Sequence, residues 1–169
     1  MGVRSRGSAE DADALIRIGI ISDTHGLLRP EAEQQLAGVA QIIHAGDIGS
    51  PDIIDRLQLI APVVAIRGNI DTGRWAECYP ESLTITLGGR CIHLLHDVKT
   101  LQLDPVAGGV EIIISGHSHR PGIETRRGVL YLNPGSAGPR RFKLPITVAT
   151  LDLTAGPLAP IIHDLSGAG

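Results

Sequence analysis

The sequence predicts an α/β fold in which two packed β-sheets form a sandwich that is flanked by helices. The first half of the chain alternates strand and helix patterns with short connections, which is typical of a parallel sheet with right-handed crossovers. In the second half, glycine-containing turn signals at 88–89 and 127–128 separate short apolar runs and indicate hairpins. Together the two halves predict two different sheets that pack on each other.

Three strands and two helices are predicted in the first half. Runs of β-branched residues predict buried strands. A helix start is indicated at Ser50, Pro51 and Asp52, which supply a capping side chain, a proline at the first helical position and an early acid. The strands are expected at 15–21, 40–44 and 62–66, and the helices at 30–39 and 50–59.

The second half predicts short strands and almost no helix. Two pairs of strands flank the turn signals, and an apolar run before Gly116 indicates another buried strand. At most a short helix fits between residues 97 and 109. The strands are expected at 82–87, 90–95, 110–115, 123–126, 129–132, 146–153 and 158–163.

Length and composition fit one domain with an aliphatic core. The chain has 169 residues, of which 43% are hydrophobic and 20% charged. Such a chain can bury a core, so disorder of the whole chain is disfavoured. We expect a single domain over residues 15–165 and a disordered N-terminal extension over residues 1–14, which are small, polar and charged.

Charge, aromatic content and cysteine count argue against several classes of function. The net charge is −3, and the aromatic residues are one Trp, two Tyr and one Phe, so nothing favours nucleic-acid binding. Cys78 and Cys91 form no disulfide framework. No apolar run is long enough to span a membrane, and the N-terminus lacks a secretory signal. We expect a cytoplasmic protein, and a homo-oligomer stays open.

Polar side chains follow the predicted strands where each one ends. In an open α/β sheet, ligands bind beyond the carboxyl ends of the strands. Carboxylates, an amide and imidazoles suit divalent ions such as Mn, Fe, Ni and Zn. Each residue alone would more often be a turn former, a helix cap or a structural histidine, but seven in succession are hard to explain as independent turns. The seven are Asp23, His25, Asp47, Asn69, His96, His117 and His119.

This series of motifs resembles the calcineurin-like metallophosphoesterase superfamily. The motifs that carry the resemblance are Asp23-x-His25, Gly46-Asp47, Gly68-Asn69-x-Asp71, His96 and Gly116-His117-x-His119. The loop Asn133-Pro134-Gly135-Ser136, followed by Pro139-Arg140, is similar to the small bacterial and archaeal phosphodiesterase branch. The resemblance covers about residues 16 to 155 and implies the four-layer αββα fold of that superfamily.

The resemblance also implies a centre of two divalent metal ions, with manganese expected and nickel, iron or zinc as alternatives. The first ion would be held by Asp23, His25 and His119, and the second by Asn69, His96 and His117. Asp47 would bridge the two ions, together with a hydroxide that attacks phosphorus. The expected catalytic residues are therefore Asp47, Asn69 and His96.

The implied function is metal-dependent hydrolysis of a small phosphate ester, with a phosphodiesterase as the main expectation. The positive net charge of two divalent ions, two carboxylates and a hydroxide favours such an anionic substrate. Two alternatives stay open. One is a protein of this fold with weak or no catalysis that serves as a binding scaffold, and the other is a phosphomonoesterase.

Two positions depart from the family pattern. Ile70 stands where many relatives carry a histidine that protonates the leaving group, so the general acid is unassigned. Relatives usually read His-Gly-His where this chain reads His96-Asp97-Val98. Asp97 would lower the charge of the site if it faces the metals, and it would be a plain loop acid if it faces away.

Supporting roles around the ligands are expected for a few further residues. Asp71 either orients a ligand histidine or is a turn carboxylate. Asn133 and Ser136 either form hydrogen bonds to ligands or phosphate or shape a tight turn. His44 is expected to support the neighbouring ligand, and His163 is expected to be solvated.

Overall fold

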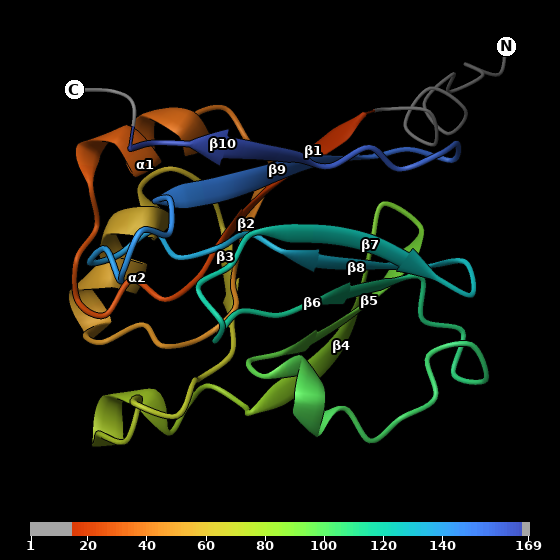
Figure 1. Cartoon of the computed structure of the whole chain (residues 1–169), viewed down its shortest axis with the longest axis horizontal. Helices are drawn as coiled ribbons and strands as arrows, with labels where there is room; N and C mark the ends of the chain where they lie inside the picture. The colour runs from red at the N-terminus through yellow and green to blue at the C-terminus, as the bar shows by residue number, and fades with distance from the viewer. Residues whose placement is uncertain (1–14, 167–169) are drawn as a thin grey trace, which may run out of the picture.

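Residues 15–166 are described by the structure, a computed structural model, and they fold into two five-stranded sheets packed face to face (Figure 1). The expected N-terminal extension, residues 1–14, lies outside the described residues. The fold is the predicted sandwich of two sheets flanked by helices. Every strand predicted from the sequence is present, with small differences at its ends.

The first sheet combines three parallel strands with two antiparallel ones. In spatial order it contains β10 (Ile161–Asp164), β9 (Thr147–Leu153), β1 (Ile16–Ile21), β2 (Gln41–His44) and β3 (Val63–Ala65). β1, β2 and β3 run parallel, whereas β9 is antiparallel to both β1 and β10. The carboxyl ends of the three parallel strands therefore meet at one edge of this sheet.

The second sheet is built from three parallel strands with a hairpin partner at each edge. In spatial order it contains β4 (Ser82–Leu87), β5 (Arg90–Leu95), β6 (Ile112–Ile114), β8 (Val129–Asn133) and β7 (Gly122–Arg126). β5, β6 and β8 run parallel, and β4 and β7 are antiparallel to their neighbours. The hairpin turns at Gly88-Gly89 and Arg127-Gly128 have positive φ angles at all four residues, as tight hairpin turns require.

Two short helices cover the outer face of the first sheet, α1 (Pro30–Leu36) and α2 (Pro51–Gln58) (Figure 1). Both begin with proline at the first helical position, where the missing N–H costs nothing. α1 ends at Leu36 rather than at the predicted residue 39. The reason is local, because Ala37 leaves the helical region with ψ of 135° and Gly38 takes φ of +85°.

The core between the sheets is aliphatic, as the composition predicts. Successive side chains of a strand point to opposite faces. Ile18 and Ile20 of β1 pack between the sheets, whereas Ile21 packs under the helices. Gly19 also faces α1, and a Cβ at this position would lie 2.5 Å from Leu36 Cδ2. Glycine at this point lets the helix lie close to the strand.

The outer face of the second sheet is covered by irregular chain. Leu101 and Leu103 pack against Ile113 and Val129. They belong to the segment between β5 and β6, which contains the 3₁₀ turn η2 (Val98–Thr100). A second 3₁₀ turn that the sequence did not indicate, η1 (Arg74–Ala76), follows β3. No helix within residues 15–166 is both long enough and apolar enough to cross a membrane.

One expectation about a histidine is wrong. His163 is not a solvated side chain but is half-buried on β10. Its Nδ1 lies 2.7 Å from Gln35 Nε2 and its Nε2 lies 2.8 Å from Thr150 Oγ1. The two contacts join β10, α1 and β9, so the ring has a structural role far from the strand ends discussed next.

Candidate metal centre

The predicted strand-end residues meet at one end of the sandwich. Asp23 and His25 follow β1, and Asp47 follows β2, so three of them come from the first sheet. The second sheet supplies His96 after β5, together with His117 and His119 after β6. Backbone hydrogen bonds join the loops, since the N–H groups of Asp23 and His25 donate to the carbonyls of Gly46 and Asp47. The site therefore spans both sheets.

Most of these residues have an unusual backbone conformation. Only seven non-glycine residues in the described part of the chain have positive φ, and five of them are candidate ligands, with φ between 46° and 71°. The five are Asp23, His25, Asp47, His117 and His119. This left-handed region costs L-residues about 1–2 kcal/mol each, although Asp and His tolerate it better than most. Strain concentrated in this way is typical of functional sites.

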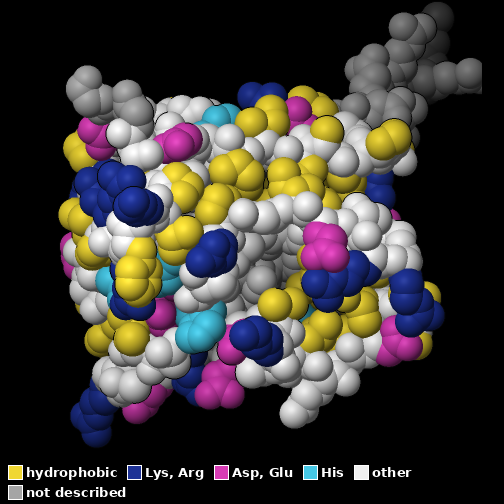
Figure 2. All heavy atoms as spheres, viewed as in Figure 1, with side chains coloured by type: hydrophobic (Ala, Val, Ile, Leu, Met, Phe, Trp, Pro, Cys, Tyr) yellow, Lys and Arg dark blue, Asp and Glu magenta, His cyan; other side chains and the backbone are white. Residues whose placement is uncertain are grey.

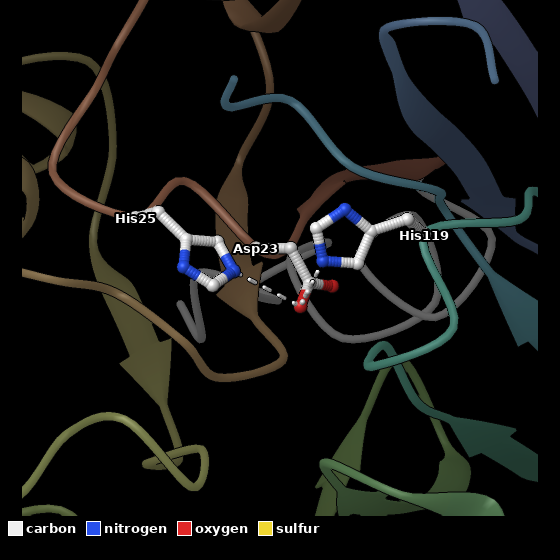
Figure 3. A group of neighbouring side chains, drawn as sticks. All are labelled: Asp23, His25 and His119. Carbon is white, nitrogen blue, oxygen red and sulfur yellow. Dashed lines mark ion pairs between the residues drawn. The ribbon is translucent and has the colours of Figure 1, made fainter. Parts of the chain in front are cut away.

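The first group of donors consists of Asp23, His25 and His119 (Figure 3). The two imidazoles approach the carboxylate from either side, and their ring centroids are 5.3 Å apart. The Nε2 atoms of His25 and His119 lie 3.8 Å and 3.4 Å from Asp23 Oδ1. Asp23 Oδ2 is occupied, since it accepts hydrogen bonds from Ser22 Oγ and from the N–H of His117. Oδ1 is thus the oxygen that remains for a ligand.

The second group consists of Asp47, His96 and His117. Asp47 Oδ2 lies 3.2 Å from His96 Nε2 and 3.4 Å from His25 Nε2, so this carboxylate reaches both groups. His96 Nδ1 lies 2.8 Å from the carbonyl of Ala45. A carbonyl only accepts, so Nδ1 carries the proton and Nε2 presents its lone pair to the centre. A metal ligand needs this tautomer.

Unpartnered buried atoms show that the donor set fits metal ions. In residues 15–166, five buried side-chain nitrogen or oxygen atoms have no hydrogen-bond partner, and four of them belong to the centre. Buried polar groups are ordinarily paired, because an unpaired one costs about 1–3 kcal/mol. Oxygen and imidazole nitrogen donors that converge without partners are what a divalent ion would satisfy. The four atoms are Asp23 Oδ1, His25 Nε2 and His96 Nε2, which face the centre, and His119 Nδ1, whose ring faces Asp23 with its other nitrogen, Nε2.

The charged groups of the centre shift one another's pKa values. Burial raises the pKa of Asp23, but the neighbouring imidazole of His25 and the charge of His96 outweigh this effect and leave the pKa below its usual value. Asp47 behaves in the same way, with His96 as its main partner. Burial lowers the pKa of His96, but Asp47 and the Ala45 carbonyl raise it above the usual value. Both carboxylates are therefore held in their anionic, ligating form.

Asn69, the seventh predicted ligand, lies at the open side of the second group. Its side chain is exposed, and it lines a hollow of about 280 Å³ together with His96 and His117. The side chain of His117 is 46% exposed, so the centre is open to solvent there. Figure 2 shows histidine side chains at the surface beside acidic and basic ones.

Comparisons with known proteins agree with this geometry. Residues 16–156 match the calcineurin-like phosphoesterase superfamily domain. The chain belongs to this superfamily. It is 37% identical over 131 residues to a probable metallophosphoesterase of Methanothermobacter thermautotrophicus, in an alignment that covers 70% of this chain and 76% of the relative.

Solved structures share the fold of this phosphoesterase. An archaeal phosphodiesterase superposes with a TM-score of 0.74 at 24% identity, covering 88% of this chain and 100% of that one. Vacuolar protein sorting 29 of Cryptosporidium parvum superposes with a TM-score of 0.77 at 20% identity, covering 90% of this chain and 93% of that one. At these identities the likeness concerns the fold.

Glycines let the loops of the phosphoesterase centre approach one another. A Cβ on Gly68 would lie 2.1 Å from Asp47 Oδ1, and a Cβ on Gly46 would lie 2.7 Å from His96 Nδ1. A Cβ on Gly116 would lie 2.0 Å from Ser22 Oγ. These glycines directly precede Asn69, Asp47 and His117 in the sequence. Each motif glycine therefore makes room for a neighbouring loop.

Among residues 15–166, the hydrogen bonds of the Asp71 side chain go to backbone N–H groups and not to a histidine, which favours the alternative of a turn carboxylate. Its side chain is buried and accepts hydrogen bonds from the N–H groups of Ile48, Gly49 and Gly68 at 2.9–3.0 Å. Asp71 is thus a turn carboxylate that ties the loop after β3 to the loop after β2.

Asn133 and Ser136 support the centre through the backbone. Asn133 Nδ2 donates to the Gly116 carbonyl and to Ser118 Oγ, while its Oδ1 accepts from the N–H of Gly135. Ser136 Oγ donates to the Asp23 carbonyl. Asn133 therefore shapes a turn and, through this turn, also holds the loop that carries His117 and His119.

His44 forms hydrogen bonds within the loop of Asp47 and to a residue that sequence reasoning missed, Thr24. Its Nδ1 accepts from the N–H of Gly46, and its Nε2 lies 3.0 Å from Thr24 Oγ1, which in turn donates to the Ile48 carbonyl. Neither Thr24 nor Ser22, which holds Asp23, stands out in the sequence, because a hydroxyl beside a strand end is usual in any loop.

Proposed function

We propose that this chain is a metal-dependent phosphodiesterase with a binuclear centre. The observation that carries the proposal is a pair of adjacent donor groups with unpartnered buried atoms, joined by Asp47 Oδ2. The residues proposed to hold the two ions are Asp23, His25, Asp47, Asn69, His96, His117 and His119. Manganese is the expected metal, with nickel, iron or zinc as alternatives, since no thiolate is among the donors.

The chain's residues position the donors and keep them charged. Ala45 and Ser22 fix the orientation of His96 and Asp23 through hydrogen bonds. Two divalent ions, when bound, would lower the pKa of a water toward neutrality and stabilise charge on a transferring phosphoryl group. Asp47, which faces both donor groups, would keep their spacing fixed during this chemistry. Such a spacing suits an in-line displacement at phosphorus.

The proposed reaction favours esters with good leaving groups. Ile70 follows Asn69 and cannot donate a proton to a departing oxygen. A diester substrate is supported by the likeness of the fold to an archaeal phosphodiesterase, although that likeness is at 24% identity. The proposed substrates are therefore phosphodiesters.

The proposal predicts metal-stimulated cleavage of bis-p-nitrophenyl phosphate. Asp47→Asn and His96→Ala should each lower kcat/KM by more than about 100-fold, because even residues that only support a ligand change activity about 10- to 100-fold. The measurement is initial rate against Mn²⁺ concentration. His163→Gln removes an imidazole outside the centre and should leave the rate unchanged. Wild-type rates in Asp47→Asn would sink the mechanism.

The two other readings predict different kinetics. A scaffold protein would bind Mn²⁺ yet cleave no phosphate ester, and its support is likeness to vacuolar protein sorting 29 in fold. A phosphomonoesterase would hydrolyse p-nitrophenyl phosphate faster than the diester. The complete set of candidate ligands favours hydrolysis over a scaffold alone. A cytoplasmic location stays a prediction.

A further inference from the structure

Asp97 faces the candidate metal centre and is held in place by its own turn. It caps η2, and its Oδ1 accepts a hydrogen bond from the N–H of Lys99 at 3.0 Å. Its backbone carbonyl accepts from Thr100 Oγ1 at 2.7 Å. The other carboxylate oxygen, Oδ2, lies 3.8 Å from His117 Nε2. The family glycine is therefore replaced by a fixed carboxylate on the open side of the second donor group.

The hollow beside this donor group contains an excess of negative charge. Apart from the candidate ligands, three charged residues line it, Arg67, Glu81 and Asp97. Arg67 and Glu81 form an ion pair at 3.6 Å and largely cancel each other. In the described part of the chain, no lysine or arginine pairs with Asp97. The carboxylate of Asp97 is thus the uncompensated charge at the mouth of the site.

We propose that Asp97 is a specificity-determining residue that selects monoanionic phosphodiesters over dianionic phosphate monoesters. The inference rests on the proposed function, because it concerns the ester that the same centre accepts. A monoester spreads two negative charges over three terminal oxygens, whereas a diester spreads one charge over two and presents uncharged ester arms. When a substrate fills the hollow, the part of it that lies next to Asp97 can be an uncharged ester arm or a charged oxygen. The ester arm is repelled less by the Asp97 carboxylate.

The size of the effect follows from Coulomb's law. A unit charge about 7 Å from Asp97, at an effective dielectric constant between about 20 and 80, changes binding roughly 3- to 50-fold per additional charge. A dianion should therefore suffer a measurable loss of affinity relative to a monoanion of similar size. The effect should shrink at high salt, because the hollow is open to solvent.

The test is Asp97→Asn, which removes the charge and keeps the cap, since Asn and Asp cap turns about equally well. Calorimetry on the Mn²⁺-loaded protein at pH 8 would compare inorganic phosphate, mostly a dianion, with dimethyl phosphate, a monoanion. Phosphate should bind the variant more tightly, and its affinity relative to that of dimethyl phosphate should rise roughly 3- to 50-fold, because the dianion carries one charge more. The ratio of kcat/KM for p-nitrophenyl phosphate over bis-p-nitrophenyl phosphate should rise in parallel.

Asp104→Asn is the matched control. Asp104 also caps a turn, with Oδ1 accepting from the N–H groups of Val106 and Ala107, but it does not line the hollow. It should leave both affinities unchanged. Equal changes for phosphate and dimethyl phosphate in Asp97→Asn would overturn the inference, as would no change for phosphate.

A third measurement separates this role from that of a metal ligand. Titration with Mn²⁺ alone should give nearly equal affinities for the wild-type protein and Asp97→Asn. A loss of Mn²⁺ affinity greater than about tenfold would instead make Asp97 a metal ligand or a residue that supports one, and would overturn the inference, since both kinds of residue change metal affinity to this extent. If the wild-type protein hydrolyses neither ester but the phosphate affinities still differ as stated, the proposed function fails and the role of Asp97 stands.

Discussion

Several candidate ligands have strained backbone conformations, which indicates that their loops position these side chains for a function. Asp23, Asp47 and His117 lie at left-handed φ values that a tight turn would fill with glycine or asparagine at lower cost. Their side chains instead belong to the two donor groups, in which several buried atoms lack partners. At the residue scale, the strained backbone lowers the stability of the fold but holds the donor side chains in position. Sequence motifs identified these residues, but nothing in the motifs predicted their backbone angles.

His44 is a buried ring whose neutral form is built into the loop of Asp47. Burial lowers its pKa from 6.5 to about 4. The hydrogen bonds agree, because Nδ1 already accepts from the N–H of Gly46 and has no room for a proton. Since the folded pKa lies below the unfolded one, the folded state binds fewer protons. Its contribution to stability is full above pH 6.5 and is lost as the pH falls toward 4.

The prediction for His44 concerns the pH dependence of unfolding. Between pH 8 and pH 5, the free energy of unfolding of the metal-free wild-type protein should fall by about 2 kcal/mol more than that of His44→Gln. Urea denaturation in EDTA at the two pH values measures this difference, and the other histidines cancel in the comparison. Parallel losses in the two proteins would show that His44 is not the group that titrates.

At the element scale, the sequence predicted strands well and their ends less well. β1 shows why, since its β-branched run is long enough to identify a buried strand without any tertiary information. α1 ended early because Gly38 turned the chain, a signal present in the sequence but weaker than the helical pattern around it. The turn η1 had no local signal, since its position depends on how the chain leaves β3.

The loop after β3 must pass unusually close to the loop after β2. Gly68→Ala would place a Cβ 2.1 Å from Asp47 Oδ1 and 2.3 Å from the Asp47 backbone nitrogen, so one loop must move. We expect Mn²⁺ affinity to fall by more than about tenfold and the free energy of unfolding to fall by about 1–3 kcal/mol. Calorimetry and urea denaturation measure the two effects.

Gly122→Ala on β7 is the control for this substitution. No atom lies within 4 Å of a Cβ built on Gly122, so the variant should keep wild-type metal affinity. An unchanged affinity in Gly68→Ala would show that the close approach of the two loops does not position Asp47. A loss of stability with normal affinity would limit the role of Gly68 to packing.

At the scale of the whole molecule, the candidate centre joins the two sheets. The sequence placed each ligand at a strand end and predicted two packed sheets, but it could not show that β9 and β10, from the second half of the chain, join β1 in the first sheet. Sheet membership depends on pairings between residues far apart in the chain, such as β1 with β9. Local patterns do not carry such pairings. The role of Asp97 was likewise open until the structure placed it beside His117.

Because the ligands come from both sheets, metal binding should stabilise the whole fold. A ligand that binds only the folded state at 100 times its dissociation constant adds about 2.7 kcal/mol. For a protein of this size, each kcal/mol of stabilisation raises the Tm by about 2–4 °C, so each bound ion should raise the Tm by about 5–10 °C. Thermal unfolding in EDTA and in saturating Mn²⁺ measures the shift.

A variant that disrupts one of the two donor groups should keep only part of the stabilisation by metal. Asp23→Asn removes the carboxylate of the first group and His117→Ala removes an imidazole of the second. Each should bind fewer Mn²⁺ ions by calorimetry than the wild-type protein and show a smaller rise in Tm, because an empty group no longer joins the loops that carry its residues. If Mn²⁺ raised the Tm of both variants as much as that of the wild-type protein, the ions would bind elsewhere and the two sheets would be held together by their aliphatic core alone.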